Sequence, residues 1–239
     1  MYNFLLIVFC FCVLAILHSY VFYPLGLLLF SKKKKKVERV YNIHDDLPII
    51  TILMAAYNEE KVLDEKIRSV IETSYPLEKI KFLIGSDAST DATNAIINSW
   101  SQKHLFIKLV EFKGRTGKAG IINQLVTLSD SSILILTDAN VIFNRETIFN
   151  LVKHFKNENV GQVCANIIKI ANSESGISGQ EKTYMAIENR IKLYESLNWQ
   201  IVIGAEGGCN AVRKENYAEV PPTFCVDDFY VTMNIIEQG

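Results

Sequence analysis

Acidic and amide side chains follow three of the apolar runs in the sequence. Asp87 and Asp138 each come at the end of such a run, and Asn58 and Glu59 follow another. If the runs are parallel strands, these side chains meet where the carboxyl ends of the strands form the ligand-binding edge of an α/β sheet. Oxygen ligands favour Mg²⁺ or Mn²⁺, so converging carboxylates there suit a nucleotide and a divalent cation.

A purely structural interpretation is open for part of this chemistry. Asn58, Ser89 and Asp91 are residue types that favour turns and helix N-caps, and that role alone would explain their presence. It explains Asp87 and Asp138 less well, because each follows a buried strand and is expected to face the same crevice. These two carboxylates are therefore the stronger candidates for a binding site.

The elements that must position these residues alternate along the chain. We expect strands at 49–54, 81–85, 106–112, 133–137 and 161–170. We expect helices near 60–72, from Thr90 or Asp91 to Trp100, at 118–129 and near 146–155. This β-α-β-α order predicts an α/β fold with a mostly parallel sheet and helices on both faces.

The first 31 residues differ from the rest of the 239-residue chain, which is 49% hydrophobic and 21% charged and so is not disordered. No charged side chain occurs before Lys32. The apolar run 4–30 is long enough to cross a bilayer as a helix. A cleaved signal peptide would need a basic start and a small-residue cleavage site, which the sequence lacks. We therefore expect a retained transmembrane anchor.

The basic cluster Lys32–Lys36 follows this run. The positive-inside rule places it, and the residues after it, in the cytoplasm, with the anchor in the inner or plasma membrane. Contact with anionic head groups is the other role open to these lysines. Without them, acidic residues outnumber basic ones, which argues against a nucleic-acid partner. We expect an anchor at 1–31, a basic juxtamembrane linker at 32–47 and a catalytic domain at 48–239.

Six short motifs occur in order along this domain. They are Ala56-Tyr57-Asn58-Glu59, Ser86-Asp87-Ala88-Ser89-Thr90-Asp91, Gly117-Lys118-Ala119-Gly120-Ile121-Ile122-Asn123, Thr137-Asp138-Ala139-Asn140, Gly204 to Arg213, and Val226-Asp227-Asp228-Phe229. As a set they resemble the motifs of family 2 glycosyltransferases, inverting enzymes with the Rossmann-like GT-A fold. Within that family the chain most resembles membrane-bound bacterial synthases of β-linked polysaccharides, such as poly-N-acetylglucosamine or hyaluronan synthase.

The resemblance implies a site for a nucleotide-sugar donor. The segment that begins Ala56-Tyr57 looks like the family's P-x-Y-N-E motif, whose backbone, with Glu59, would hold the uridine. Asp87 would hydrogen-bond the base, and Lys118 would lie beside the donor nucleotide.

The resemblance also implies a metal site, with Mg²⁺ or Mn²⁺ as the cofactor. Asp138 and Asn140 stand at the positions of the family's D-x-D motif. Asn140 replaces the second aspartate, which removes one negative charge although an amide oxygen can still coordinate a hard cation. We therefore expect weakened or altered metal binding.

The last two motifs are implied to form the acceptor side and the catalytic base. Gly207, Gly208, Arg213 and Asp227 would line the acceptor, and Asp228 would be the general base. Two structural roles stay open from the residues alone. The glycines could form a tight turn, and Asp228 could be the N-cap of a C-terminal helix.

The implied activity is inverting transfer of a sugar, from a UDP-linked donor to a glycan or lipid-linked acceptor, in cell-surface polysaccharide synthesis. The alternative is a catalytically weak or inactive nucleotide-sugar-binding or scaffold fragment, which the Asn140 replacement favours. Membrane-bound members of the family usually continue into a Q-x-x-R-W-type segment and further transmembrane spans. We therefore expect the sequence that ends at Gly239 to be truncated at its C-terminus.

Overall fold

A computed structural model gives the fold of the chain. It describes residues 1–31, 39–168, 177–205 and 207–238. Lys32–Lys36, Glu206 and Gly239, which the sequence analysis mentions, lie outside the described residues. The chain divides into two compact units, which are 1–37 with 168–202, and 38–167 with 203–239.

The first unit begins with three consecutive helical elements, α1 (Tyr2–Leu17), the π-helical turn η1 (His18–Phe22) and α2 (Tyr23–Ser31). Pro24 lies two residues after the end of the π-helical turn and has no N–H to donate to that turn, which accounts for the irregularity there. The whole stretch Tyr2–Ser31 is long and apolar enough to cross a membrane by length and composition. The anchor expected at 1–31 stays a prediction.

The same unit contains α7 (Ile177–Trp199), for which the sequence analysis expected no element. Tyr23 Oη donates a hydrogen bond to Glu195 Oε1 at 2.6 Å, and Asn198 Nδ2 donates to Leu27 O at 3.1 Å. Leu27 is buried. These contacts join α2 to the second half of α7.

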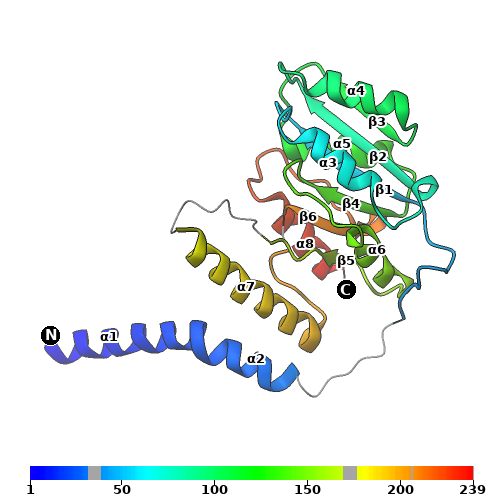
Figure 1. The fold of residues 1–239 in the computed structure, drawn as a ribbon. Helices are drawn as coiled ribbons and strands as arrows, with labels where there is room; N and C mark the ends of the chain where they lie inside the picture. The colour runs from blue at the N-terminus through cyan, green and yellow to red at the C-terminus, as the bar shows by residue number, and fades with distance from the viewer. Residues whose placement is uncertain (32–38, 169–176, 206, 239) are drawn as a thin grey trace. The chain divides into compact units, whose positions relative to one another are not determined.

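The second unit is built on one six-stranded sheet (Figure 1). Its strands are β1 (Ile50–Ala56), β2 (Ile80–Asp87), β3 (Ile107–Phe112), β4 (Ile133–Thr137), β5 (Gln162–Cys164) and β6 (Cys209–Arg213), in the spatial order β3-β2-β1-β4-β6-β5. The first four strands in this order are parallel to one another, as predicted. β6 runs antiparallel to both of its neighbours, so the sheet is mixed.

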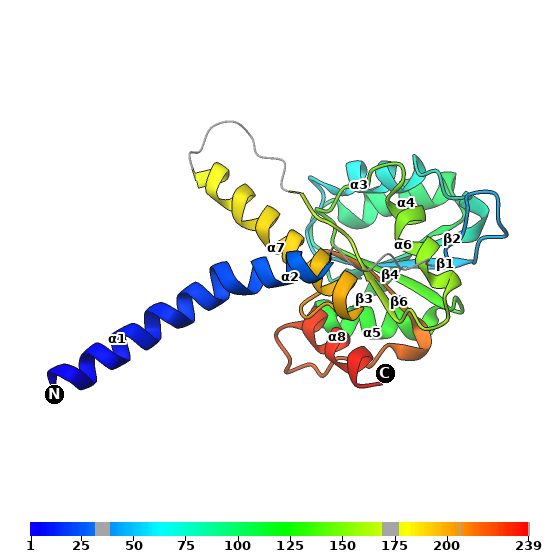
Figure 2. The same ribbon diagram turned by 90° about the horizontal axis from the view of Figure 1, so that it is seen from below.

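Helices cover both faces of the sheet, as predicted (Figure 2). One face carries α3 (Leu63–Ile71), α4 (Thr93–Lys103) and α6 (Thr147–Val152), and the other carries α5 (Lys118–Leu128) and α8 (Asp227–Glu237). The short 3₁₀ turns are η2 (Leu77–Lys79), η3 (Lys153–Lys156) and η4 (Lys214–Asn216). Ile52 and Met54 pack into the core of the first face, and Leu53 packs into the core of the second. Burial on both faces explains why every residue of β1 except Thr51 is apolar.

The strand expected at 161–170 is much shorter in the structure. β5 pairs only with β6, and Cys164 lies opposite Asn210 in that pairing. β6 begins at Cys209, so β5 has no strand to pair with beyond that residue. The hydrogen bond from Ala165 N to Cys209 O lies at this limit. Residues 165–168 therefore form no strand, and 169–170 lie outside the described residues.

The strand order changes direction at β1. The chain adds β2 and β3 on one side of β1 and then returns to place β4 on its other side. Ligands of open α/β sheets bind at such a switch point, beyond the carboxyl ends of the strands. The segments that follow β1, β2 and β4 meet there, as the sequence pattern predicts.

Candidate active site

A pocket of about 290 Å³ opens at the carboxyl ends of β1, β2 and β4. It is lined by Ala55, Ala56, Tyr57, Glu59, Asp87, Arg115, Lys118, Asp138, Ala139 and Asn140. All seven residues predicted for the donor and the metal are in this group. The structure therefore brings the predicted donor and metal residues together in one pocket, although they come from four separate segments of the chain.

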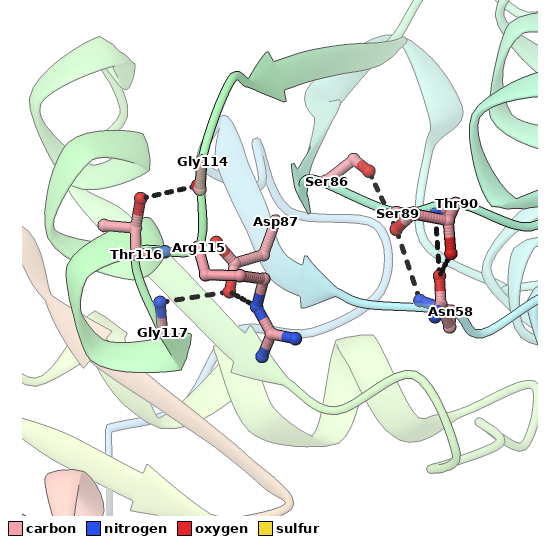
Figure 3. A network of polar contacts seen from close by, with 9 residues as sticks. All are labelled: Asn58, Ser86, Asp87, Ser89, Thr90, Gly114, Arg115, Thr116 and Gly117. Carbon is pink, nitrogen blue, oxygen red and sulfur yellow. Dashed lines mark hydrogen bonds and ion pairs between the residues drawn. The ribbon is translucent and has the colours of Figure 1, made fainter.

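Asp87, the last residue of β2, organises the loop in front of α5 (Figure 3). Its carboxylate accepts hydrogen bonds from Thr116 N, from Gly117 N at 3.0 Å and from Arg115 Nε at 3.0 Å. The Asp87 side chain is only 5% exposed. Gly117 has φ of +81°, a left-handed conformation that glycine adopts without strain, and it directly precedes Lys118. Asp87 thus fixes the turn that aims Lys118 into the pocket.

Arg115 is a pocket residue that the sequence analysis did not assign. Its guanidinium carbon lies 3.3 Å from the centroid of the Tyr57 ring, in a cation–π arrangement, while Nε binds Asp87. Tyr57 is 41% exposed, so one part of its ring remains open to solvent. In the sequence, only its position two residues before Gly117-Lys118 pointed to a role for Arg115 in the site. Its contact with Tyr57 depends on the fold.

The segments after β1 and β2 interlock through their polar side chains (Figure 3). Asn58 N donates to Ser89 Oγ at 3.2 Å, and Thr90 N donates to Asn58 Oδ1 at 2.8 Å. Glu60 N donates to Asp91 Oδ2 at 3.2 Å. Asn58 has φ of +54°, which asparagine tolerates better than most residues. These hydrogen bonds give Asn58, Ser89 and Asp91 a structural role at the rim of the pocket. None of the three is the N-cap of α4, which is Ala92.

Lys118 connects the pocket to the start of α8. Its Nζ lies 2.8 Å from Asp138 Oδ1 and 3.5 Å from Asp227 Oδ2. Burial acts to lower the pKa of Lys118, but the two carboxylates outweigh it and raise the pKa above its ordinary value. Lys118 is therefore a fixed positive charge between two negative ones.

Oxygen donors that suit a hard divalent cation face this pocket. Asp138 and Asn140 follow β4, and Glu59 lines the same pocket. Burial raises the pKa of Glu59, and the nearby carboxylates of Asp138 and Asp91 raise it further. Among the described residues no cluster of three His, Cys, Asp or Glu could hold a metal by itself. This donor set fits a cation that takes its remaining ligands from water and from substrate phosphates.

Asp227 and Asp228 form the first turn of α8, where the helix dipole favours negative charge. Val226 is the N-cap residue, so the interpretation of Asp228 as the N-cap is wrong. Asp228 Oδ1 accepts a hydrogen bond from Phe229 N at 2.8 Å. Lys118, Asp227 and Asp228 all line a small cavity of about 20 Å³, so Asp228 shares a cavity with one of the predicted donor residues.

Gly207 and Gly208 lie at this site because β6 is antiparallel to β4. Cys209 pairs with Thr137 at the carboxyl end of β4, so the residues just before β6 reach the site. A Cβ on Gly207 would lie 2.5 Å from Asp228 Oδ2, and one on Gly208 would lie 2.7 Å from Ile167 Cδ1. Close approach to neighbouring side chains is therefore the structural reason for both glycines.

Arg213 lies away from these residues. It pairs with Ile133, at the amino end of β4 and about 13 Å along the strand from Cys209. Its guanidinium donates hydrogen bonds to the backbone oxygens of Val160, Phe155 and Asn157. The structure thus corrects the prediction that Arg213 lines the acceptor side. Because β6 is antiparallel to β4, Arg213 lies at the amino end of β4, away from the site.

Comparison with known proteins agrees with this geometry. Residues 51–220 match the family model described as glycosyl transferase family 2. The poly-β-1,6-N-acetyl-D-glucosamine synthase of Staphylococcus epidermidis is 30% identical over 174 residues, which cover 70% of this chain and 41% of that protein. The chain therefore spans less than half the length of this curated relative.

Solved structures with a similar fold include a mannosyltransferase and a protein bound to a nucleotide sugar. The mannosyltransferase PcManGT from Pyrobaculum calidifontis, in complex with GDP-Man and Mn²⁺, superposes with a TM-score of 0.76 at 24% identity, covering 95% of this chain and 63% of that one. S. aureus TarS in complex with UDP-GlcNAc gives a TM-score of 0.55 at 16% identity, covering 78% and 52%. Both likenesses confirm the predicted GT-A fold. Because the family model matches residues 51–220, which make up most of the chain, the chain belongs to glycosyl transferase family 2.

Proposed function

We propose that this chain is a membrane-anchored, inverting glycosyltransferase that moves a sugar from a UDP-linked donor to a glycan or lipid-linked acceptor. The observation that carries the proposal is the position of Lys118 between Asp138 and Asp227, with Asp228 beside them. Lys118 offers a positive charge to a diphosphate, and Asp228 offers a carboxylate to the proton of a hydroxyl group. Both residues lie at the same end of the sheet.

The donor occupies the pocket of about 290 Å³, near the lower size limit of typical small-molecule sites. The Tyr57 ring and Arg115 lie at the end suited to a flat base. Asp87 uses three acceptor positions within the protein and keeps about one for a base, since a carboxylate has roughly four. Glu59 and the backbone at Ala56 hold the nucleoside.

Lys118 contributes a positive charge for the donor diphosphate. Asp138 and Asn140 would hold Mg²⁺ or Mn²⁺, which would supply positive charge to neutralise the leaving diphosphate. Asp228 accepts the proton of the acceptor hydroxyl as the hydroxyl oxygen bonds to the anomeric carbon. The bond from that carbon to the diphosphate breaks on the opposite face, which inverts the configuration and releases the nucleoside diphosphate.

The acceptor reaches Asp228 from the side of Gly207, Gly208 and Asp227, where the backbone of Gly207 lies against the Asp228 carboxylate. The match to a poly-β-1,6-N-acetyl-D-glucosamine synthase supports a glycan acceptor and a role in cell-surface polysaccharide synthesis. The apolar stretch Tyr2–Ser31 supports a membrane location. Lys32–Lys36 then orient the catalytic unit towards the cytoplasm.

Calorimetric titration of the whole chain with UDP and with GDP, each with and without Mn²⁺, tests the donor proposal. We expect UDP to bind in a Mn²⁺-dependent manner and more tightly than GDP. Tighter binding of GDP would contradict the UDP assignment and leave the family unchanged. Failure of a folded chain to bind either nucleotide would contradict the donor site itself.

A second candidate function is nucleotide-sugar binding without useful catalysis. Asn140 favours it, because the replacement of an aspartate leaves Asp138 as the one carboxylate of the D-x-D segment. Slow or absent sugar transfer by a chain that binds the donor would favour this alternative. Donor turnover that depends on Asp228 would favour the enzyme.

A further inference from the structure

Lys66 is a completely buried lysine behind the active site. It lies near the amino end of α3 and is 0% exposed. Lysine is almost never fully buried unless it is paired with an acidic group. Among the residues that the structure describes, Lys66 makes no ion pair, and its polar contacts are hydrogen bonds to a hydroxyl and a carbonyl.

These two hydrogen bonds hold the two ends of one short segment. Lys66 Nζ donates to Thr137 Oγ1 at 2.9 Å and to the backbone oxygen of Val141. Thr137 and Val141 directly flank the segment that carries Asp138 and Asn140. An amino group can donate both bonds whether or not it is protonated.

The contact continues from Thr137 to the glycine segment. Thr137 Oγ1 lies 3.3 Å from Gly208 O, and Asp138 N donates to the same oxygen at 3.0 Å. Lys66 is therefore at one end of a buried hydrogen-bonded chain that reaches both the Asp138 segment and the Gly207-Gly208 segment.

Packing alone does not account for a lysine at this position. Its Nζ lies 3.5 Å from the centroid of the Phe143 ring, in a core that methionine would fill with similar volume. Burial of an amino group costs free energy that methionine would not, so its hydrogen bonds to Thr137 and Val141 are what lysine adds.

We propose that Lys66 is a positioning residue for the divalent cation. Through Thr137 and Val141 it holds Asp138 and Asn140 in the arrangement that binds the cation together with the donor diphosphate. This inference rests on the cation site of the proposed function.

The test measures Mn²⁺ affinity of the whole chain in detergent, by electron paramagnetic resonance of free Mn²⁺, with UDP and with GDP in parallel. Lys66→Met should weaken Mn²⁺ binding about tenfold, the range typical of residues that orient metal ligands. Thr137→Val should weaken it less. The double variant should bind like Lys66→Met alone, because both changes break the same contact.

Tyr75→Phe is the matched control. Tyr75 is also buried, and its hydroxyl donates to Pro48 O before the opposite end of β1. This variant should lower the melting temperature and leave Mn²⁺ affinity unchanged. Without metal, amide hydrogen exchange at 138–141 should be faster in Lys66→Met and unchanged in Tyr75→Phe.

Three results would overturn the inference in distinguishable ways. If Lys66→Met folds and its Mn²⁺ affinity is within twofold of that of the original chain, Lys66 does not position the cation, and the proposed function still stands. If Lys66→Met does not fold, an unchanged Mn²⁺ affinity in Thr137→Val would equally show that Lys66 has no such role. If the original chain binds no Mn²⁺ with either nucleotide, the cation site of the proposed function falls as well.

Discussion

Lys118 Nζ lies 2.8 Å from Oδ1 of Asp138, the carboxylate that we propose as a metal ligand. If Asp138 binds the cation as proposed, Lys118 and the cation compete for the same oxygen until a diphosphate draws the lysine away. Both side chains are about 40% exposed, so the pair is weaker than a buried one.

Replacement of this lysine should separate metal binding from donor binding. Lys118→Met should strengthen Mn²⁺ binding to the nucleotide-free chain by up to about fivefold, because a competing half-exposed ion pair of up to roughly 1 kcal/mol is lost. It should weaken UDP binding, because the diphosphate loses a cation. Calorimetry with Mn²⁺ alone measures the first effect, and calorimetry with UDP at saturating Mn²⁺ measures the second. A loss of affinity for both ligands would contradict competition at Asp138.

Asp228 should affect transfer without affecting donor binding. Asp228→Asn keeps the shape of the side chain and removes its basicity, so the transfer rate should fall at least about 100-fold. The measurement is release of UDP from UDP-N-acetylglucosamine in the presence of an N-acetylglucosamine oligosaccharide, next to calorimetry with UDP. Transfer at the normal rate would show that Asp228 is not the base.

Asp227→Asn is the neighbouring control for that experiment. Asp227 contacts Lys118 at 3.5 Å, so its replacement should alter UDP affinity more than Asp228→Asn does. Equal effects of the two changes on both measurements would mean that the residues act as one acidic cluster.

Asp87 should act on the donor through the loop it binds. Asp87→Asn loses the ion pair with Arg115 and cannot accept all three hydrogen bonds, so amide exchange at 115–118 should become faster. UDP affinity should fall about tenfold, which corresponds to the loss of one hydrogen bond to a charged group. Glu111→Gln is the control, because Glu111 is a carboxylate on β3 that bonds Asn94 at the surface. Unchanged exchange at 115–118 in Asp87→Asn would contradict this role.

The donor side of the site could be predicted from sequence for a physical reason. Parallel strands covered on both faces are continuous apolar runs, and their polar ends must meet at one edge of the sheet. Asp87 and Asp138 were found in this way, and the structure places both in one pocket. The family resemblance added Lys118 and Asp228, whose positions depend on helices rather than on strand ends.

The remaining features depend on pairings between distant segments. The direction of β6 decides that Gly208 reaches the site and Arg213 does not, and no local pattern gives that direction. The length of β5 follows from where β6 begins. Lys66 reads as one polar residue of an amphipathic helix, and only the fold places its amino group beneath β4.

Lys66 should also leave a signature in the pH dependence of stability. Burial lowers its pKa to about 7, whereas an unfolded lysine has a pKa near 10.4. Between these values the unfolded chain binds more protons, so this lysine makes the free energy of unfolding rise with pH, by at most about 1.4 kcal/mol per pH unit.

At higher pH Cys209 makes the free energy of unfolding fall as pH rises, because burial raises the pKa of its thiol to about 11. The comparison therefore belongs between pH 6.5 and about 8.5, below the ordinary pKa of a thiol. Over that range, thermal unfolding followed by tryptophan fluorescence should show stability rising more steeply in the original chain than in Lys66→Met. Parallel curves would mean that Lys66 keeps an ordinary pKa, and that hydration or a charge partner reaches it in the folded protein.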